Sequence, residues 1–399
     1  MSQRQIHSSQ QVALLAAGHF LNDFYCNFLP VLLPIIMPRT GLSIAMAGVL
    51  VLVMSITSNL LQPFFGYLMD RRNLAWLLTP VIPFGAVCIC GIGFIESKAA
   101  LFLLIALTGL SVSAFHPLGS SLVARASDPK RASRSMSYFV AGGNIGFAIA
   151  PSLIIAFADA ISLFALPLLA LPAFALAWLY ARSGLPALRT ASPRARGARA
   201  GSPSAGLAGI LRDPDVLKLN LSMGLRCWTH VVISTFLPLL LVTNGYSKLL
   251  SGTLLSIFLA GCAAGGLAGG WLGDRISHKT LMIASLLLAI APAAYALQCA
   301  APEPLPMAAL FLSGFFILAP QPASIVAAQR MMPENGGLAS GMMLGLSFAL
   351  GAAGTALTAA LATFTGLSAA MLASVLPLAA SAAITARIRF PDAGRSSRS

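Results

Sequence analysis

Apolar runs of about 20 residues recur along the whole chain, separated by short polar stretches. A helix rises 1.5 Å per residue, so each run can cross the roughly 30 Å hydrocarbon core of a bilayer. Hydrophobic residues make up 57% of the 399 residues and charged residues 9%, which excludes an ordinary soluble protein. The sequence therefore predicts an all-α polytopic membrane protein with twelve transmembrane helices, at residues 12–37, 43–68, 74–95, 99–124, 135–157, 161–181, 216–242, 249–272, 280–300, 307–329, 336–362 and 367–386.

Two other interpretations of these runs fail. Transmembrane β-strands would be about 10 residues long with strict alternation, a pattern this sequence lacks. A cleaved signal peptide would not carry the polar residues found in the first run, which is also too long for one.

Basic residues gather on one side of the predicted membrane. With the N-terminus inside, 21 of the 25 Lys and Arg residues fall on the cytoplasmic side. Only Arg39, Lys98 and Lys248 lie opposite, and Arg226 falls within a span. This bias predicts a multi-pass protein of the bacterial inner membrane with both termini in the cytoplasm. It also accounts for the net charge of +14, so we expect no nucleic-acid partner.

The chain divides at its middle into two halves. Residues 183–212 include a stretch rich in Ser, Pro, Gly, Ala and Arg, a composition typical of a flexible linker. We therefore expect a six-helix bundle at 1–182, a cytoplasmic linker at 183–212 and a second six-helix bundle at 213–399. The halves also share a motif, because Gly66–Arg71 at the end of the second span is repeated 204 residues later as Gly270–Arg275. Parallel repeats of this kind are a signature of one transporter architecture.

The repeated pattern G-x-x-x-D-R resembles the loop motif of the major facilitator superfamily, in the expected arrangement of six plus six spans. The resemblance implies two pseudo-symmetric bundles around a central cavity lined by spans 1, 4, 7 and 10. A narrower resemblance, to the fosmidomycin-resistance family of efflux transporters, rests on four stretches of the first half, at 18–23, 61–67, 113–117 and 142–146. In that family a Glu usually follows the Phe-His-Pro sequence, where this chain has Leu118.

The repeated motif predicts a latch for the cytoplasmic gate. Its glycines permit close helix contact, and its aspartates can lie against the positive N-terminal end of a helix in the other half. The alternative is a solvated turn that only sets topology. The six residues of this predicted latch are Gly66, Asp70, Arg71, Gly270, Asp274 and Arg275.

Asp23 is the only acidic residue inside any of the apolar runs, and a carboxylate in hydrocarbon marks a functional site by default. His19 and Asn22 lie four and three residues before it, so the three side chains share one helix face. His116 in the fourth span lies at a similar depth, about 13 Å from the cytoplasmic end. Histidine titrates near neutral pH, so Asp23, His19 and His116 are predicted to couple transport to protons.

The seventh span carries Arg226 and His230 on one face. Arg226 lies about 15 Å deep, close to the depth of Asp23, and an unpaired arginine there costs several kcal/mol. Arg226, His230 and Asn22 are therefore predicted to bind substrate or to act as charge partners, with Asp23 paired to Arg226. The alternative is that these polar groups only hydrogen-bond between helices.

No Walker A sequence occurs, and no cytoplasmic domain is large enough to hydrolyse nucleotide. No cysteine pair has the spacing of a metal or haem motif. We therefore expect no catalytic residues, cofactor or metal, and a functional monomer. The sequence predicts a proton-coupled antiporter that exports a small polar or amphiphilic compound by alternating access. Two alternatives stay open: proton-coupled uptake of an organic acid, sugar or metallophore, and a non-transporting membrane scaffold.

Overall fold

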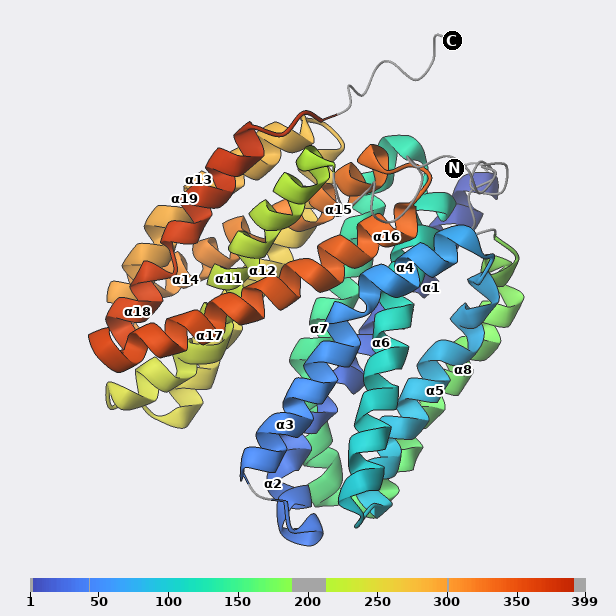
Figure 1. Cartoon of the computed structure of the whole chain (residues 1–399), viewed down its shortest axis with the longest axis horizontal. Helices are drawn as coiled ribbons and strands as arrows, with labels where there is room; N and C mark the ends of the chain where they lie inside the picture. Colours follow the sequence, from blue (N-terminus) through green and yellow to red (C-terminus); the bar gives the residue numbers. More distant parts are fainter. Residues whose placement is uncertain (1–2, 43, 189–212, 300, 391–399) are drawn as a thin grey trace. The chain divides into compact units, whose positions relative to one another are not determined.

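The computed structural model describes residues 3–42, 44–188, 213–299 and 301–390, which fold almost entirely into helices (Figure 1). No β-strand occurs within these ranges. Most of the predicted linker, residues 189–212, lies outside the described part of the chain, as does the C-terminal tail at 391–399.

The chain forms two compact units, Met1–Gly197 with Gly337–Leu346, and Ala198–Gly336 with Ser347–Ser399. The units follow the two predicted halves except at Gly337–Leu346, which packs with the first unit. The reason is a set of contacts that this short segment makes with the backbone at residues 59–66 and with the side chain of Asp70, described below.

The long helices of the first unit are α1 (Gln3–Cys26), α2 (Phe28–Thr40), α3 (Ile44–Ser55), α4 (Gln62–Arg71), α5 (Leu78–Cys90), α6 (Lys98–Ala126), α7 (Ala132–Ala160) and α8 (Leu171–Arg182). A π-helical turn, η1 (Ile56–Leu60), joins α3 to α4. Short 3₁₀ turns complete the unit, at η2 (Ala75–Leu77), η3 (Gly91–Phe94), η4 (Pro129–Arg131), η5 (Leu163–Ala170) and η6 (Leu185–Ala187).

The second half of the chain contributes α11 (Pro214–Thr243), α12 (Lys248–Gly273), α13 (His278–Gln298), α14 (Pro304–Leu318), α15 (Pro320–Met331), α16 (Gly336–Gly341), α17 (Ser347–Thr365), α18 (Leu367–Ala373) and α19 (Leu376–Ala386). A second π-helical turn, η8 (Met342–Leu346), joins α16 to α17. Prolines 320 and 322 lack an N–H, and the helix is accordingly divided there into α14 and α15.

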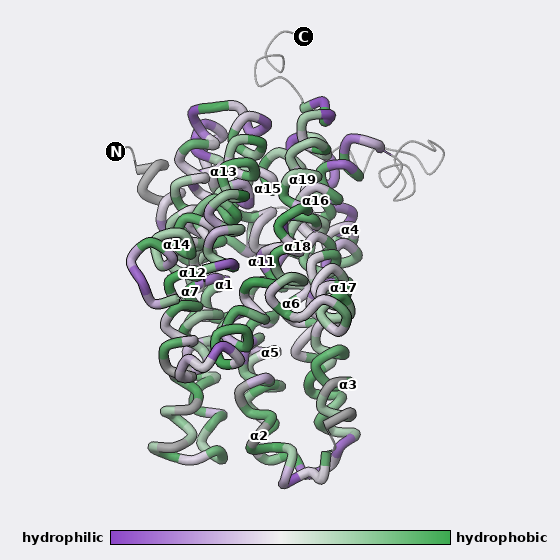
Figure 2. The backbone as a smooth tube through the Cα atoms, turned by 90° about the vertical axis from the view of Figure 1, so that its left-hand side faces the viewer, coloured by the Kyte–Doolittle hydropathy of each residue, from purple (hydrophilic) through white to green (hydrophobic). Residues whose placement is uncertain are grey.

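Ten helical segments of the described chain are long and apolar enough to cross a membrane. The remaining two predicted spans are also helical: 12–37 corresponds to α1 and α2, and 135–157 to α7. The fold class is therefore confirmed, whereas the count of twelve crossings stays a prediction in that detail. Hydrophobic residues follow the helices, and hydrophilic residues gather mostly at helix ends and in loops (Figure 2).

The first predicted span breaks at Asn27. Pro30 has no N–H to donate to the carbonyl of Cys26, so the helix cannot continue regularly through this point. The Asn27 side chain instead donates to the carbonyl oxygen of Phe147 on α7, at 2.8 Å. Further along the same contact, Gly142 and Gly146 let α7 meet the backbone of α1 at Ala16 and Phe20. The residues of α1 before this break are thereby fixed against α7.

Gly337, Gly341 and Gly345 recur every four residues and so share one helix face. They meet the backbone at Gly66, Gln62 and Asn59 respectively. A Cβ atom on Gly337 would lie 2.7 Å from the carbonyl oxygen of Gly66, so only glycine permits this approach. The contact fixes the segment Gly337–Leu346 on η1 and α4.

Candidate functional site

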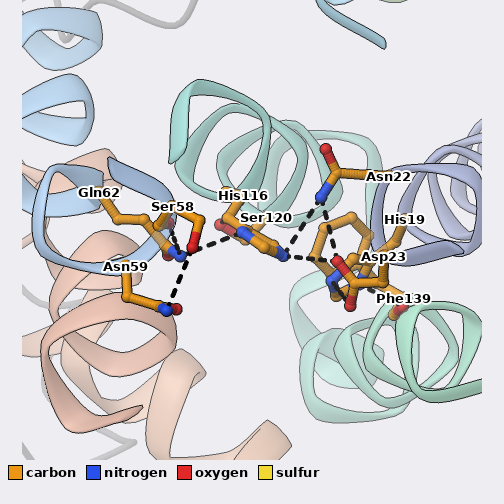
Figure 3. A network of polar contacts seen from close by, with 9 residues as sticks. All are labelled: His19, Asn22, Asp23, Ser58, Asn59, Gln62, His116, Ser120 and Phe139. Carbon is orange, nitrogen blue, oxygen red and sulfur yellow. Dashed lines mark hydrogen bonds and ion pairs between the residues drawn. The ribbon is translucent and has the colours of Figure 1, made fainter. Parts of the chain in front are cut away.

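Asp23 lies between two histidines in the first unit (Figure 3). Its Oδ2 lies 3.2 Å from Nε2 of His19, one turn earlier on α1. Its Oδ1 lies 3.0 Å from Nε2 of His116 on α6 and accepts a hydrogen bond from Nδ2 of Asn22, also at 3.0 Å. The Asp23 side chain is 18% exposed and that of His19 only 5%. We refer to His19, Asp23 and His116 as the proton cluster.

The far side of each ring is also held. Nδ1 of His19 lies 2.7 Å from the carbonyl oxygen of Phe139 on α7, and the His19 ring stacks on the Phe139 ring with centroids 4.1 Å apart. Nδ1 of His116 lies 3.1 Å from Nε2 of Gln62. Both rings are therefore fixed at two nitrogens, which leaves little freedom in where their hydrogens lie (Figure 3).

The hydrogens of His19 follow from these partners. A carbonyl oxygen only accepts, so Nδ1 of His19 carries a hydrogen for Phe139. Nε2 faces a carboxylate oxygen, and a bare ring nitrogen and a carboxylate would both accept. A second hydrogen must lie between them, on His19 or on Asp23. The pair thus holds one proton more than a carboxylate beside a neutral histidine.

The donor atoms of the cluster lie within 4.8 Å of one another, a spacing that would also suit a divalent cation. The contacts of 3.0 and 3.2 Å are also hydrogen-bond lengths, so hydrogen bonds alone can hold this arrangement. The role of the cluster in proton coupling and the absence of a metal both stay predictions.

Gly143 belongs to the same site and was not singled out from the sequence. A Cβ atom there would lie 2.5 Å from Oδ2 of Asp23 and 2.6 Å from Nε2 of His19. Any larger residue would therefore press on the shared hydrogen bond. The sequence signal was present, since Gly142 and Gly143 are adjacent, but only the fold distinguishes the one that faces α1's backbone from the one that faces Asp23.

Arg226 lies in the second unit and is 1% exposed. Its guanidinium donates to the carbonyl oxygen of Ile317 at 3.2 Å and to Sγ of Cys227 at 3.1 Å. His230, one turn later on α11, lies against the ring of Phe258, with centroids 5.8 Å apart. The predicted pairing of Arg226 with Asp23 concerns residues of different units, and it stays a prediction.

The side chain of Asp70 lies at the start of the segment Gly337–Leu346. Its two carboxylate oxygens accept hydrogen bonds from the backbone N–H groups of Gly337 and Leu338, at 2.8 and 2.9 Å. Asp70 is 2% exposed, so these bonds replace its lost hydration. Gly66, one turn earlier, makes the close backbone contact described above.

The two copies of the motif share a contact between an arginine and an aromatic ring. Arg71 lies over the ring of Tyr67, 5.1 Å from its centroid, and Arg275 lies over the ring of Trp271 at 5.5 Å. The two pairs are 204 residues apart, the offset found from the sequence. The repeat therefore extends to a cation–π contact at the end of each motif.

A cavity of about 1050 Å³ opens elsewhere in the first unit, at the ends of α1, α6 and α7. Its lining includes Arg125, Arg131 and Arg134 together with several serines, whereas the residues of the proton cluster do not line it. The cavity is thus separate from the candidate site.

The family model of the Major Facilitator Superfamily matches residues 15–242 and 219–399. The chain is 28% identical over 358 residues to the fosmidomycin resistance protein of Escherichia coli (strain K12), covering 88% of this chain and 86% of that protein. It is 25% identical over 372 residues to the uncharacterized MFS-type transporter YfnC of Bacillus subtilis (strain 168), covering 90% and 88%. The predicted resemblance to fosmidomycin-resistance proteins is therefore confirmed.

Solved structures show the same fold at low identity. The E. coli fucose:proton symporter FucP superimposes with a TM-score of 0.76 at 16% identity, over 95% of this chain and 98% of that one. The human organic anion transporter MFSD10 gives 0.73 at 17% identity, over 96% and 100%. Both are described as transporters. The family matched by this chain is one of transporters, which agrees with the expectation that the protein is not an enzyme. With the family model matched along nearly its whole length, the chain belongs to the Major Facilitator Superfamily.

Proposed function

We propose that this transporter is a proton-coupled antiporter that exports a small polar or amphiphilic compound by alternating access. The observation that supports it best is the proton cluster, in which Asp23 and His19 share a hydrogen inside an apolar helix bundle. A buried carboxylate is expensive to keep in hydrocarbon, and a site that changes charge is what proton coupling requires.

Exchange takes place in one cycle of the cluster. Asp23 and His19 bind a proton while the site is open to the acidic side, and they release it on the other side before substrate is carried outward. His116, whose Nε2 lies 3.0 Å from the second oxygen of Asp23, keeps that carboxylate in place. Arg226, His230 and Asn22 contribute polar groups for substrate.

The substrate class is proposed from the relatives. The E. coli relative is named for fosmidomycin resistance, so a fosmidomycin-like drug or metabolite is the first compound to test. The likeness to a sugar symporter supports the fold alone. Uptake, the alternative left open by the sequence, is the competing direction.

The protein is placed in the bacterial inner membrane as a monomer with both termini in the cytoplasm, in keeping with the positive-inside rule. In this orientation Asp70 latches the cytoplasmic gate, with Gly66, Arg71 and the second motif copy in supporting roles. A reporter active only outside the cytoplasm, fused after Ser399, should be silent. Activity of that reporter would overturn the orientation.

The test is flux in inverted vesicles whose interior is more acidic than the medium. An exporter that exchanges drug for protons should accumulate labelled fosmidomycin inside, and a protonophore should abolish the accumulation. Flux of drug outward with protons would indicate uptake in the cell. No substrate-dependent flux for any compound screened would favour a scaffold.

A further inference from the structure

The side chain of Gln62 is fully buried, yet only one end of its amide is satisfied. Nε2 donates to the carbonyl oxygen of Ser58 at 2.8 Å and lies 3.1 Å from Nδ1 of His116. Within the described residues, Oε1 has no hydrogen-bond partner. A buried oxygen without a hydrogen bond destabilises the fold, so another contact must hold the amide in this orientation.

The orientation of the amide fixes the hydrogens of His116. The Ser58 carbonyl only accepts, so the amide atom beside it is nitrogen. The same nitrogen therefore also donates to Nδ1 of His116, which must be bare. The ring hydrogen then lies on Nε2, 3.0 Å from Oδ1 of Asp23 (Figure 3). His116 is thus the neutral Nε2–H form and donates to Asp23.

Gly345 holds Gln62 in place from the other side. A Cβ atom on Gly345 would lie 2.7 Å from Cβ of Gln62 and 2.9 Å from its Cδ. The backbone carbonyl of Gln62 meets Gly341, on the same helix face as Gly345. The amide is therefore confined between Gly345 and His116.

We propose that Gln62 is a positioning residue of the proton cluster, which keeps His116 in the neutral Nε2–H form so that the exchanged proton stays on the His19–Asp23 pair. A second proton on His116 would place its Nδ1–H against the Gln62 N–H group, which opposes that protonation. Turning the amide to present Oε1 would break the bond to Ser58 inside η1. This inference rests on the proposed proton coupling.

The other groups around the cluster do not replace this role. Helix α1 brings His19, Asp23 and the thiol of Cys26, and α7 contributes the Phe139 carbonyl and Gly143. Nδ2 of Asn22 lies 3.5 Å from Nε2 of His116 and donates to Oδ1 of Asp23, so it leaves Nδ1 of His116 to Gln62. In η1 and α4, the residue that contacts a ring nitrogen of His116 is Gln62. Its replacement should therefore alter His116 specifically.

The direct test is ¹⁵N NMR of labelled histidine in nanodiscs, with His116 assigned by comparison with His116→Gln. In the wild type, Nε2 should be protonated and Nδ1 bare at neutral pH. Gln62→Met, which keeps size but cannot donate, should give a mixture of the two neutral forms. Gln62→Glu offers only acceptor oxygens and should yield the doubly protonated ring.

Gly345→Ala tests the same idea without replacing a polar side chain. Its new Cβ would clash with the carbonyl oxygen of Asn59 and lie 2.7 Å from Cβ of Gln62, so it should displace the η1–Gln62 turn and shift the His116 signals toward those of Gln62→Met. Gly266→Ala is the matched control, because a Cβ there meets nothing within 4 Å. If Gln62→Met does not fold, Gln62→Glu and Gly345→Ala still test whether Gln62 controls the hydrogens of His116. Unchanged His116 signals in the folded variants, or a wild-type ring protonated on Nδ1, would overturn the proposal.

The functional measurement is the pH profile of fosmidomycin-driven proton release from the purified protein. Gln62→Glu should move the profile to higher pH by about one unit or more, as expected for a new carboxylate beside the ring. A purely structural role would lower the amplitude at every pH without moving the profile, and would count against the inference. Absence of proton release in the wild type would instead count against the proposed function, while the NMR result would still decide on Gln62.

Discussion

His19 precedes Asp23 by one helical turn, and its Nε2 lies 3.2 Å from the Asp23 carboxylate while its Nδ1 is held by a backbone carbonyl. If Asp23 were ionised and His19 neutral, a carboxylate oxygen would face a ring nitrogen without a hydrogen. Both atoms would accept and neither would donate, so this state is excluded. The proton between them is set by the fold and not by the side chains alone, which gives the first prediction.

Asp23→Asn should keep the fold and remove pH-gradient-driven transport. Asparagine has the same shape, its oxygen still accepts from His116, and its N–H group can donate to a His19 nitrogen that no longer needs a proton. The network then has no exchangeable proton. Flux in proteoliposomes should fall to background, whereas His278→Gln, a histidine replaced outside the cluster, should transport at wild-type rates. Proton-driven flux through Asp23→Asn would refute the mechanism and move the coupling to the histidines.

Asp70→Asn should weaken the latch without loss of expression. One of the two N–H groups, of Gly337 or Leu338, would face an amide N–H in place of an oxygen. Removing a charge from a helix start costs about 0.3–2 kcal/mol, which shifts a balanced gate several-fold. Initial transport rates at matched membrane expression measure the effect. Asp128→Asn is the control, because that carboxylate caps only the exposed turn η4. Equal rates in the two variants would reduce the motif to a topological turn.

Gly143→Ala should damage the cluster although alanine is the better helix former by about 1 kcal/mol. The added Cβ would lie 2.5 Å from Oδ2 of Asp23, and such overpacking costs about 1–3 kcal/mol. We expect a lower melting temperature and slower proton-coupled flux than in Gly266→Ala. If the variant were as stable and active as that control, Asp23 and His19 could move to accommodate the added Cβ, and the prediction would be wrong.

The predicted pairing of Asp23 with Arg226 can be tested by a double-mutant cycle. The cycle compares Asp23→Asn, Arg226→Gln and the double variant. If the two charges pair, the double variant should lose less unfolding free energy than the two single losses added together. The coupling energy should then be about 0.5–3 kcal/mol in the unfolding free energy. Strict additivity would mean that Arg226 serves only its contacts with Ile317 and Cys227.

The sequence predicted what depends on local spacing. The apolar runs, the repeated motif, and the shared face of His19, Asn22 and Asp23 all follow from helix geometry. The similar depth of Asp23 and His116 could also be counted along each span, and the two side chains meet.

Contacts between distant spans could not be predicted in this way. Phe139, Gly143 and Gln62 complete the cluster, but each is an ordinary residue in its own helix. Only the packing of α6 and α7 on α1, and of α4 on α6, brings them to the histidines. The grouping of Gly337–Leu346 with the first unit is missed for the same reason, since nothing in its composition names its partner.

The π-helical turns η1 and η8 each insert about one residue more than an α-helical turn would hold. Each residue of an α-helix turns the chain by about 100°, so this surplus decides which way every later side chain in the helix points. Removing one residue from η1 would swing Gln62 away from His116 and Asp70 away from Gly337 together. One inserted residue in η1 therefore directs both Gln62 toward His116 and Asp70 toward Gly337. Deletion of that residue in a relative would disable both sites together.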